Sequence, residues 1–305
     1  MNDNPNPDFL QVGEFPHPIQ KQVMPIMAKV YDQVFPVGTG FVITTSGLMM
    51  TAGHVLEAAR SKAVPRETDE GGKALYVELY AMYASNDTHP EDSVGGMWPI
   101  DSFRRHRNLD VGVCRLKGAT RRETGKSVRW PPLTLSPGIP VVGSRVWAYG
   151  YFLMTGSGGM GDDGLETMNF RQSSAYTQGE IIDVHPEYRD QAFLSFPCFR
   201  TNARFDPGMS GGPIINEAGY VCGVVCSSSP PSEDGEDHLS YGSMIWPALM
   251  IGLENVRLGD EPAKDVTLLD MARGGYIATD DTLDQVHLVK YGDDGMFLMA
   301  ENWNP

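Results

Sequence analysis

Three residues of this 305-residue chain, His54, Asp110 and Ser210, have the types and the order needed to turn a serine hydroxyl into a nucleophile. His54 follows Thr-Ala-Gly, Asp110 opens the run Asp-Val-Gly-Val, and Ser210 lies within Gly-Met-Ser-Gly-Gly. A serine hydroxyl attacks poorly unless a base takes its proton, and an imidazole with a pKa of about 6.5 can accept and return that proton. A carboxylate would hold the imidazole in one tautomer and stabilise its cation. The three residues therefore predict acyl transfer through an ester on Ser210.

The glycines around Ser210 predict a site for the negatively charged oxygen of a tetrahedral intermediate. Glycine lets the backbone approach a reacting group closely, so the backbone N–H groups of Gly208 and Ser210 are the candidate oxyanion-hole donors. Losing one such donor costs roughly 10²–10³ in rate. Each of the three segments, taken alone, has an ordinary explanation as a turn or a strand end. Their order and their separations of 56 and 100 residues favour the catalytic interpretation.

Residues 208–212 also fit the G-x-S-x-G turn of α/β hydrolases, which is a rival interpretation. In that fold the acid and then the histidine follow the serine. Only His238 and His287 follow it here, and His238 is 28 residues away, which leaves little room for an acid-bearing strand. Pro213 and the Asn-Glu-Ala-Gly turn at 216–219 indicate a hairpin after the serine rather than a helix. The rival is therefore disfavoured.

The elements that must position these residues are mostly short β-strands. Apolar or alternating runs bounded by Gly, Pro, Asn, Asp and Ser are typical of strands, and they occur at residues 40–45, 48–51, 75–80, 110–116, 146–150 and 213–216. Many short strands favour barrels or sandwiches over β-α-β units. A proline-rich stretch at 130–140 indicates a connection between two halves. Beyond residue 250 the pattern changes to a short helix at 265–271 and a hairpin at 285–300.

Composition and charge exclude several classes of protein. With 24 Lys and Arg against 39 Asp and Glu, the net charge of −15 argues against nucleic acid as a partner, because phosphates would be repelled. No apolar run is long enough to span a membrane, and neither H-E-x-x-H nor C-x-x-C occurs, so we expect no metal and no cofactor. The opening residues lack the basic and apolar regions of a secretory signal. The chain has only four cysteines, which we interpret as buried reduced thiols: Cys114, Cys198, Cys222 and Cys226. Reduced thiols are typical of the cytoplasm, which is therefore the expected location.

At these motifs the chain resembles the trypsin/chymotrypsin-like serine protease superfamily, nearest its bacterial high-temperature-requirement (Deg-type) branch. The shared segments are residues 38–43, 51–55, 109–113, 201–203, 208–216 and 219–225, which occur in the family's order. The resemblance implies a mainly β fold of two antiparallel six-stranded β-barrels with a short C-terminal extension. The barrels would span 1–135, with His54 and Asp110, and 136–250, with Ser210; the extension would span 251–305.

The resemblance also implies a serine endopeptidase that cleaves protein or peptide substrates, with the active cleft between the barrels. The walls of its substrate pocket would be Cys226, Ser227, Ser228, Tyr241, Gly242 and Ser243. Met209 stands where the digestive branch has an aspartate, and the last 55 residues are too few for the Deg-type peptide-binding domain. An intracellular regulatory or processing protease therefore fits better, with room for a regulatory protein partner. The alternative is a catalytically silent, protease-like binding module.

Substrate preference has two opposite candidates in the sequence. The acidic run at 233–237 would favour basic side chains if it faced the pocket, and is otherwise a solvated loop. Arg204, six residues before Ser210, would instead favour acidic side chains. The basic stretches at 104–107 and 121–122 are interpreted as solvated loop surface.

Overall fold

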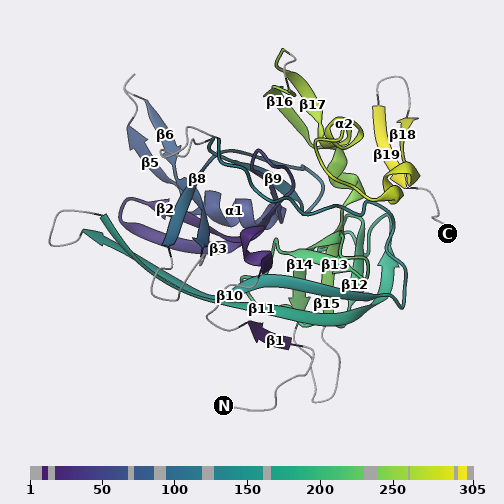
Figure 1. The fold of residues 1–305 in the computed structure, drawn as a ribbon, viewed down its shortest axis with the longest axis horizontal. Coiled ribbons are helices and arrows are strands. Elements are labelled where there is room, and N and C mark those ends of the chain that lie inside the picture. The colour runs from purple at the N-terminus through teal and green to yellow at the C-terminus, as the bar shows by residue number, and fades with distance from the viewer. Residues whose placement is uncertain are drawn as a thin grey trace.

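The computed structural model describes residues 9–12, 18–67, 72–85, 94–118, 127–160, 166–229, 239–259, 262–291 and 295–300. In this part of the chain the fold is mainly β, as the sequence predicts. Two antiparallel barrels lie side by side, and the C-terminal elements pack together next to the second barrel (Figure 1).

Six antiparallel strands close the first barrel in the order β2-β3-β4-β9-β8-β7. Between β4 and β7 the chain forms a helix, α1, and a small hairpin, β5–β6. The barrel is filled by fully buried apolar side chains such as Met24, Phe41 and Met49, each of which contributes roughly 1.5–3 kcal/mol on burial. The bounds are η1 Pro18–Lys21, β2 Val23–Val30, β3 Gln33–Val42, β4 Leu48–Thr51, α1 Gly53–Ser61, β5 Val64–Glu67, β6 Lys73–Tyr76, β7 Glu78–Ser85, β8 Val94–Arg105 and β9 Gly112–Leu116.

The second barrel has the strand order β11-β10-β13-β14-β15-β12, and the pairing of β11 with β12 closes it. A further strand, β1, pairs with β11 from outside the ring. Each half thus holds six antiparallel strands, which confirms the expected pair of barrels. The bounds are β1 Phe9–Val12, β10 Arg145–Met160, β11 Glu166–His185, β12 Cys198–Thr201, β13 Pro213–Asn216, β14 Val221–Ser229 and β15 Leu239–Met244.

The strands after the candidate nucleophile form a hairpin, as predicted. Asn216 ends β13, and its side-chain oxygen accepts from the backbone N–H groups of Ala218 at 3.1 Å and Tyr220 at 3.0 Å. Gly219 has φ +83°, a left-handed conformation that glycine adopts without strain. The helix that an α/β hydrolase would place after its serine is therefore replaced by a strand that begins at Pro213.

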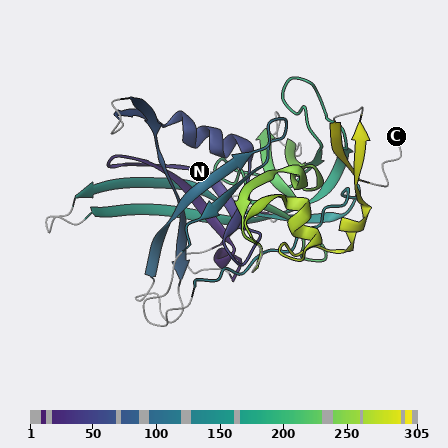
Figure 2. The same ribbon diagram turned by 90° about the horizontal axis from the view of Figure 1, so that it is seen from above.

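A long hairpin of β10 and β11 extends from the second barrel past the first (Figures 1 and 2). Where β10 passes the first barrel, the Tyr151 hydroxyl donates to the backbone carbonyl of Val23 at 3.0 Å, and both residues are buried. Residues 117–144 connect the two barrels, and the expected division at 135 and 136 falls within this connection. That division stays a prediction.

The C-terminal elements share the core of the barrels. Leu135, in the connection between the barrels, forms β-bridges to both Val221 and Thr279. Leu249 and Leu268 are fully buried in the same apolar cluster as the first barrel. The bounds are η3 Trp246–Met250, β16 Gly252–Val256, β17 Lys264–Thr267, α2 Leu268–Arg273, η4 Asp281–Gln285, β18 Val286–Tyr291 and β19 Gly295–Ala300.

The predicted C-terminal hairpin is confirmed, and the predicted helix begins later than expected. β18 and β19 pair in an antiparallel register, while the turn between them lies outside the described residues. Residues 264–267 pair with β16 as a strand, so the helix starts only at Leu268. Thr267 and Asp270 form a reciprocal capping box, which fixes that start.

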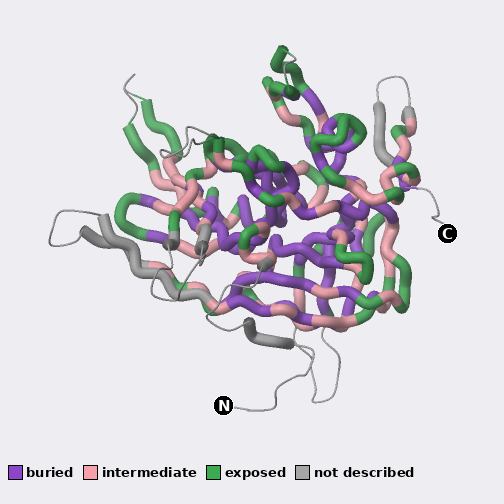
Figure 3. The backbone as a smooth tube through the Cα atoms, viewed as in Figure 1, coloured by how far each residue is buried: buried purple, intermediate pink, exposed green. Residues whose placement is uncertain are grey.

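Most buried residues lie within the two barrels, and the exposed residues are concentrated in hairpins at the periphery (Figure 3). All four cysteines are buried and their thiols are free. No helix of the described residues is long and apolar enough to cross a membrane. Within the same residues, no group of three or more His, Cys, Asp or Glu side chains is placed to hold a metal ion.

Candidate active site

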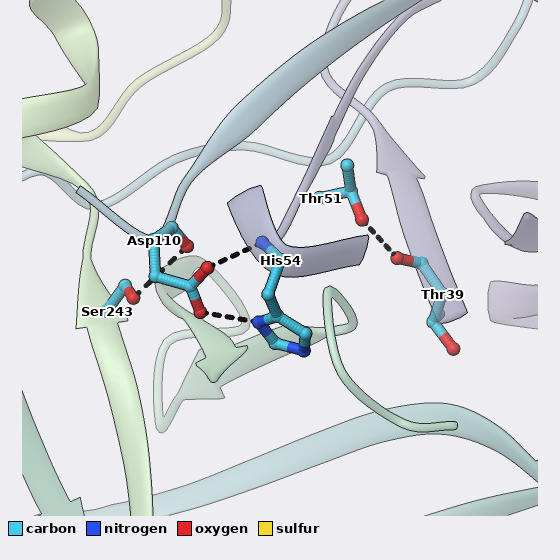
Figure 4. Close-up of polar contacts among 5 residues, drawn as sticks. All are labelled: Thr39, Thr51, His54, Asp110 and Ser243. Carbon is cyan, nitrogen blue, oxygen red and sulfur yellow. Dashed lines mark hydrogen bonds and ion pairs between the residues drawn. The ribbon is translucent and has the colours of Figure 1, made fainter. Parts of the chain in front are cut away.

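The pairing of β4 with β9 brings His54 and Asp110 together. Thr51 at the end of β4 lies opposite Gly112 at the start of β9, and each candidate catalytic residue lies just beyond its strand. Asp110 Oδ1 accepts from the backbone N–H of His54 at 2.7 Å, and its Oδ2 lies 2.7 Å from His54 Nδ1 (Figure 4). Two contacts from one carboxylate fix both the first turn of α1 and the orientation of the imidazole.

The surroundings of Asp110 keep its carboxylate ionised. Burial would by itself raise the pKa of this carboxyl group, but hydrogen bonds from the His54 ring, the His54 backbone and the Cys226 thiol, together with attraction to the imidazole, bring its pKa below the ordinary value. An ionised Asp110 requires a proton on His54 Nδ1, which leaves Nε2 to act as the base. The side chain of His54 is 46% exposed, against 14% for Asp110, so the base faces the open side.

Two consecutive tight turns present Ser210. In the first, Met209 N–H donates to the carbonyl of Asp206 at 3.0 Å, with Gly208 at φ +101°. In the second turn, Gly212 N–H donates to the carbonyl of Met209 at 2.9 Å, and Gly211 has φ +86°. A positive φ at the third position is typical of type II turns and favours glycine there. Ser210 occupies the second position of the second turn.

Close packing gives a second reason for these glycines. A Cβ added at Gly208 would lie 2.7 Å from the carbonyl oxygen of Tyr151. A Cβ at Gly211 would collide with the carbonyl oxygen of Thr39 and the hydroxyl of Thr51. The nucleophile loop is therefore wedged between β10 of its own barrel and β3 and β4 of the other.

Thr39 of β3 holds the nucleophile loop across the interface of the barrels. Its backbone N–H donates to the carbonyl of Ser210 at 2.8 Å, and its hydroxyl donates to the carbonyl of Gly208 at 2.8 Å. Thr51 in turn donates its hydroxyl to the carbonyl of Thr39 at 2.6 Å (Figure 4). Thr39 was not predicted from the sequence; its position between Gly38 and Gly40 was the available signal.

The three candidate catalytic residues line one cavity of about 1160 Å³. Among the described residues, the backbone N–H groups of Gly208 and Ser210 donate no hydrogen bond, so both predicted oxyanion donors are available. No hydrogen bond joins the Ser210 hydroxyl to the His54 ring in the described part of the chain. Such contacts are often long without substrate and tighten when it binds.

The predicted pocket walls divide into lining and supporting residues. Four line the cavity: Cys226, Ser227, Ser228 and Tyr241. The other two lie behind it. Ser243 is buried and its hydroxyl donates to the backbone carbonyl of Asp110 at 3.4 Å, while a Cβ added at Gly242 would meet the ring of Phe199 at 2.7 Å.

The structure also places residues at the cavity that the sequence did not single out for it. They come from α1, the end of β8, the turn before β9 and the loop between β11 and β12: Glu57, Arg105, Arg107, Arg189 and Phe193. Arg204 instead forms a two-point ion pair with Asp206, at 2.7 and 2.8 Å, and Asp206 is the member of the pair that lines the cavity. The acidic run at 233–237 lies outside the described residues.

Comparison with known proteins identifies the family. The family model described as the trypsin-like peptidase domain matches residues 38–224. Similar solved structures include the MamO protease domain from Magnetospirillum magneticum in its apo form, at 15% identity and a TM-score of 0.43, covering 75% of this chain and 94% of that one. Deg5 is similar at 16% identity and a TM-score of 0.43, covering 74% and 84%. No curated protein matches the chain. Because the family match spans more than half of the chain and includes His54, Asp110 and Ser210, the chain belongs to the trypsin-like peptidase domain family.

Proposed function

We propose that this protein is a serine endopeptidase that hydrolyses peptide bonds through an acyl-enzyme at Ser210. The observation that carries the proposal is the arrangement around one cavity. His54, the carboxylate of Asp110 that orients its imidazole, and Ser210 all line it. The backbone N–H groups of Gly208 and Ser210 in the same loop donate no hydrogen bond to any described residue. These are the parts that acyl transfer by serine requires.

The residues have distinct roles in the proposed reaction. Ser210 Oγ attacks the peptide carbonyl while His54 Nε2 takes its proton, and Asp110 stabilises the resulting imidazolium. The N–H groups of Gly208 and Ser210 bind the oxyanion. Collapse of the intermediate breaks the C–N bond, and His54 returns the proton to the leaving amine. Water then attacks the ester with His54 again as base, which releases the acid and restores the Ser210 hydroxyl.

The proposal extends to the setting of the enzyme. We propose a cytoplasmic processing or regulatory protease with protein substrates and a regulatory protein partner. The four buried free thiols support a reducing compartment, because oxidising compartments favour disulfides. Fractionation of cells that produce the protein would test this, and recovery only from an extracytoplasmic fraction would contradict it.

A fluorophosphonate probe tests the catalytic claim, since it reacts covalently with activated serine hydroxyls. We expect the purified protein to be labelled at Ser210, with labelling lost in Ser210→Ala and reduced strongly in His54→Ala. Ser61→Ala is the matched control, because Ser61 is an exposed serine at the end of α1. Cleavage of an unfolded protein such as casein should follow the same pattern.

The alternative, a catalytically silent binding module, predicts a different outcome. Wild-type protein would then remain unlabelled and would leave casein intact under conditions in which its barrels are folded. That result would overturn the proposed activity.

A further inference from the structure

Each carboxylate that lines the cavity already has a cationic or histidine partner. This matters because a free carboxylate there would favour basic substrates and repel acidic ones. The contacts are Glu57 with Arg105 at 2.7 Å, Asp110 with His54 at 2.7 Å and Asp206 with Arg204 at 2.7 Å. Among the described residues, Glu57 and Asp206 are therefore neutralised by arginines, and Asp110 is engaged by its hydrogen bond to His54.

The arginines of the cavity are compensated unequally. Arg105 is held by Glu57. Arg189 lies 3.3 Å from Asp190 and has its guanidinium 5.0 Å above the ring of Tyr241. Arg107 makes no ion pair and no hydrogen bond with any other described residue, although it lines the cavity. Within the part of the chain that the structure describes, Arg107 is thus an arginine of the cavity lining whose donors are all available.

The position of Arg107 is fixed by the same turn that positions the catalytic acid. It lies between the end of β8 at Arg105 and Asp110, and the His106 N–H donates to the carbonyl of Val111 at 3.0 Å. The whole chain carries a net charge of −15 and therefore repels anions in general. Arg107 instead places a positive charge at the cavity. The local cation thus gives the cavity a selectivity that the overall charge does not.

We propose that Arg107 is a specificity-determining residue that binds a carboxylate of the substrate, so that the enzyme prefers peptides with Asp or Glu beside the scissile bond. This rests on the proposed peptidase function. Arginine binds carboxylates through two parallel N–H donors, a geometry that an amide or an ammonium group does not reproduce. The preference comes from Arg107 and not from Arg204, whose guanidinium is engaged by Asp206.

A positional library of fluorogenic peptides with Glu or its neutral isostere Gln at each site tests the inference. At one position we expect wild-type kcat/KM to favour Glu over Gln by roughly 5- to 20-fold, as charge-assisted hydrogen bonds allow. Arg107→Gln should lower kcat/KM for the Glu peptide relative to the Gln peptide until the two values are equal. Arg107→Glu should instead favour Lys at that position. Arg257→Gln, which removes an exposed charge just after β16 and outside the cavity, is the matched control.

The outcomes separate this inference from the proposed function. An enzyme that is labelled by fluorophosphonate and cleaves Glu and Gln peptides equally would overturn the role of Arg107 and leave the peptidase intact. A preference for Lys or Arg that persists in Arg107→Gln would also overturn it, and would point to the acidic run at 233–237. Binding of the same peptides to Ser210→Ala, measured by fluorescence anisotropy, decides the question even if turnover is absent: equal affinities for Glu and Gln peptides would contradict the inference.

Discussion

The backbone N–H of Thr39 donates to the carbonyl oxygen of Ser210 at 2.8 Å, so the barrel that carries His54 and Asp110 also holds the candidate nucleophile. The Thr39 hydroxyl adds a second bond, to the carbonyl of Gly208 at 2.8 Å, and accepts from the N–H of Tyr151 at 3.1 Å. One buried side chain thus joins β3, β10 and the nucleophile loop.

Thr39→Val should lower both stability and turnover. Valine keeps the volume but leaves the Gly208 carbonyl and the Tyr151 N–H without their partner, and each buried unsatisfied group costs about 1–3 kcal/mol. Because Gly208 is also a proposed oxyanion donor, we expect kcat to fall roughly tenfold, which is less than the loss of a whole donor. Thr39→Ser keeps the hydroxyl and serves as the control in urea unfolding and peptide-cleavage assays. Equal values for the valine and serine variants would contradict the role of the hydroxyl.

Gly211→Ala should be far more destabilising than Gly219→Ala. Both glycines have positive φ, +86° and +83°, so both variants carry the left-handed strain of roughly 1–2 kcal/mol. Only at Gly211 does the added Cβ collide with neighbouring atoms, the Thr39 carbonyl and the Thr51 hydroxyl; at Gly219 nothing lies within 4 Å. We expect an additional loss of about 2 kcal/mol or more at Gly211. Free energies of unfolding from urea titrations measure the difference, and similar losses for the two variants would exclude the collision.

The sequence predicted the local segments of the site well because each depends on near neighbours. The strand before His54, the run after Asp110 and the glycines around Ser210 are all local patterns. The paired barrels followed only from the family resemblance, since strand alternation does not determine which strands pair. The C-terminal helix was expected three residues too early because the strand pairing of 264–267 is a tertiary contact that overrides local propensity.

Contacts across the barrels were not predictable from local pattern. Thr39 lies 171 residues from Ser210 in sequence, and its position between two glycines does not by itself say which segment it contacts. The basic stretch at 104–107 was interpreted as solvated surface, yet Arg105 and Arg107 line the cavity. A run of basic residues looks the same in sequence whether it faces solvent or a substrate cavity. Only the path of the chain between β8 and β9 shows that this run borders the cavity.

The four thiols should be inert in the folded protein. Burial raises the pKa of Cys114 and of Cys222 to about 12 and that of Cys198 to about 11, and it raises the pKa of Cys226 well above its ordinary value. Since the thiolate is the reactive form, a raised pKa leaves little of it at pH 8. We expect a thiol reagent such as dithionitrobenzoate to detect almost none of the four in native buffer and all four in guanidinium. Rapid reaction of any of them in the native protein would contradict this burial.

Asp110 should make stability depend on pH in a way that Asp110→Asn abolishes. The folded-state pKa of this carboxyl lies below its ordinary value of 3.8, because hydrogen bonds from His54 and Cys226 outweigh the effect of burial. A depressed pKa contributes stability that is fully present above the unfolded-state pKa and is lost as pH falls through the folded-state pKa. The difference in unfolding free energy between wild type and Asp110→Asn, from urea titrations, should therefore be smaller below about pH 4 than at pH 5. In the same variant kcat at pH 7 should fall by roughly 10⁴, as loss of the orienting carboxylate does in serine triads. A stability difference that grows on acidification would mean that the Asp110 carboxylate is not stabilised by His54 in the folded protein.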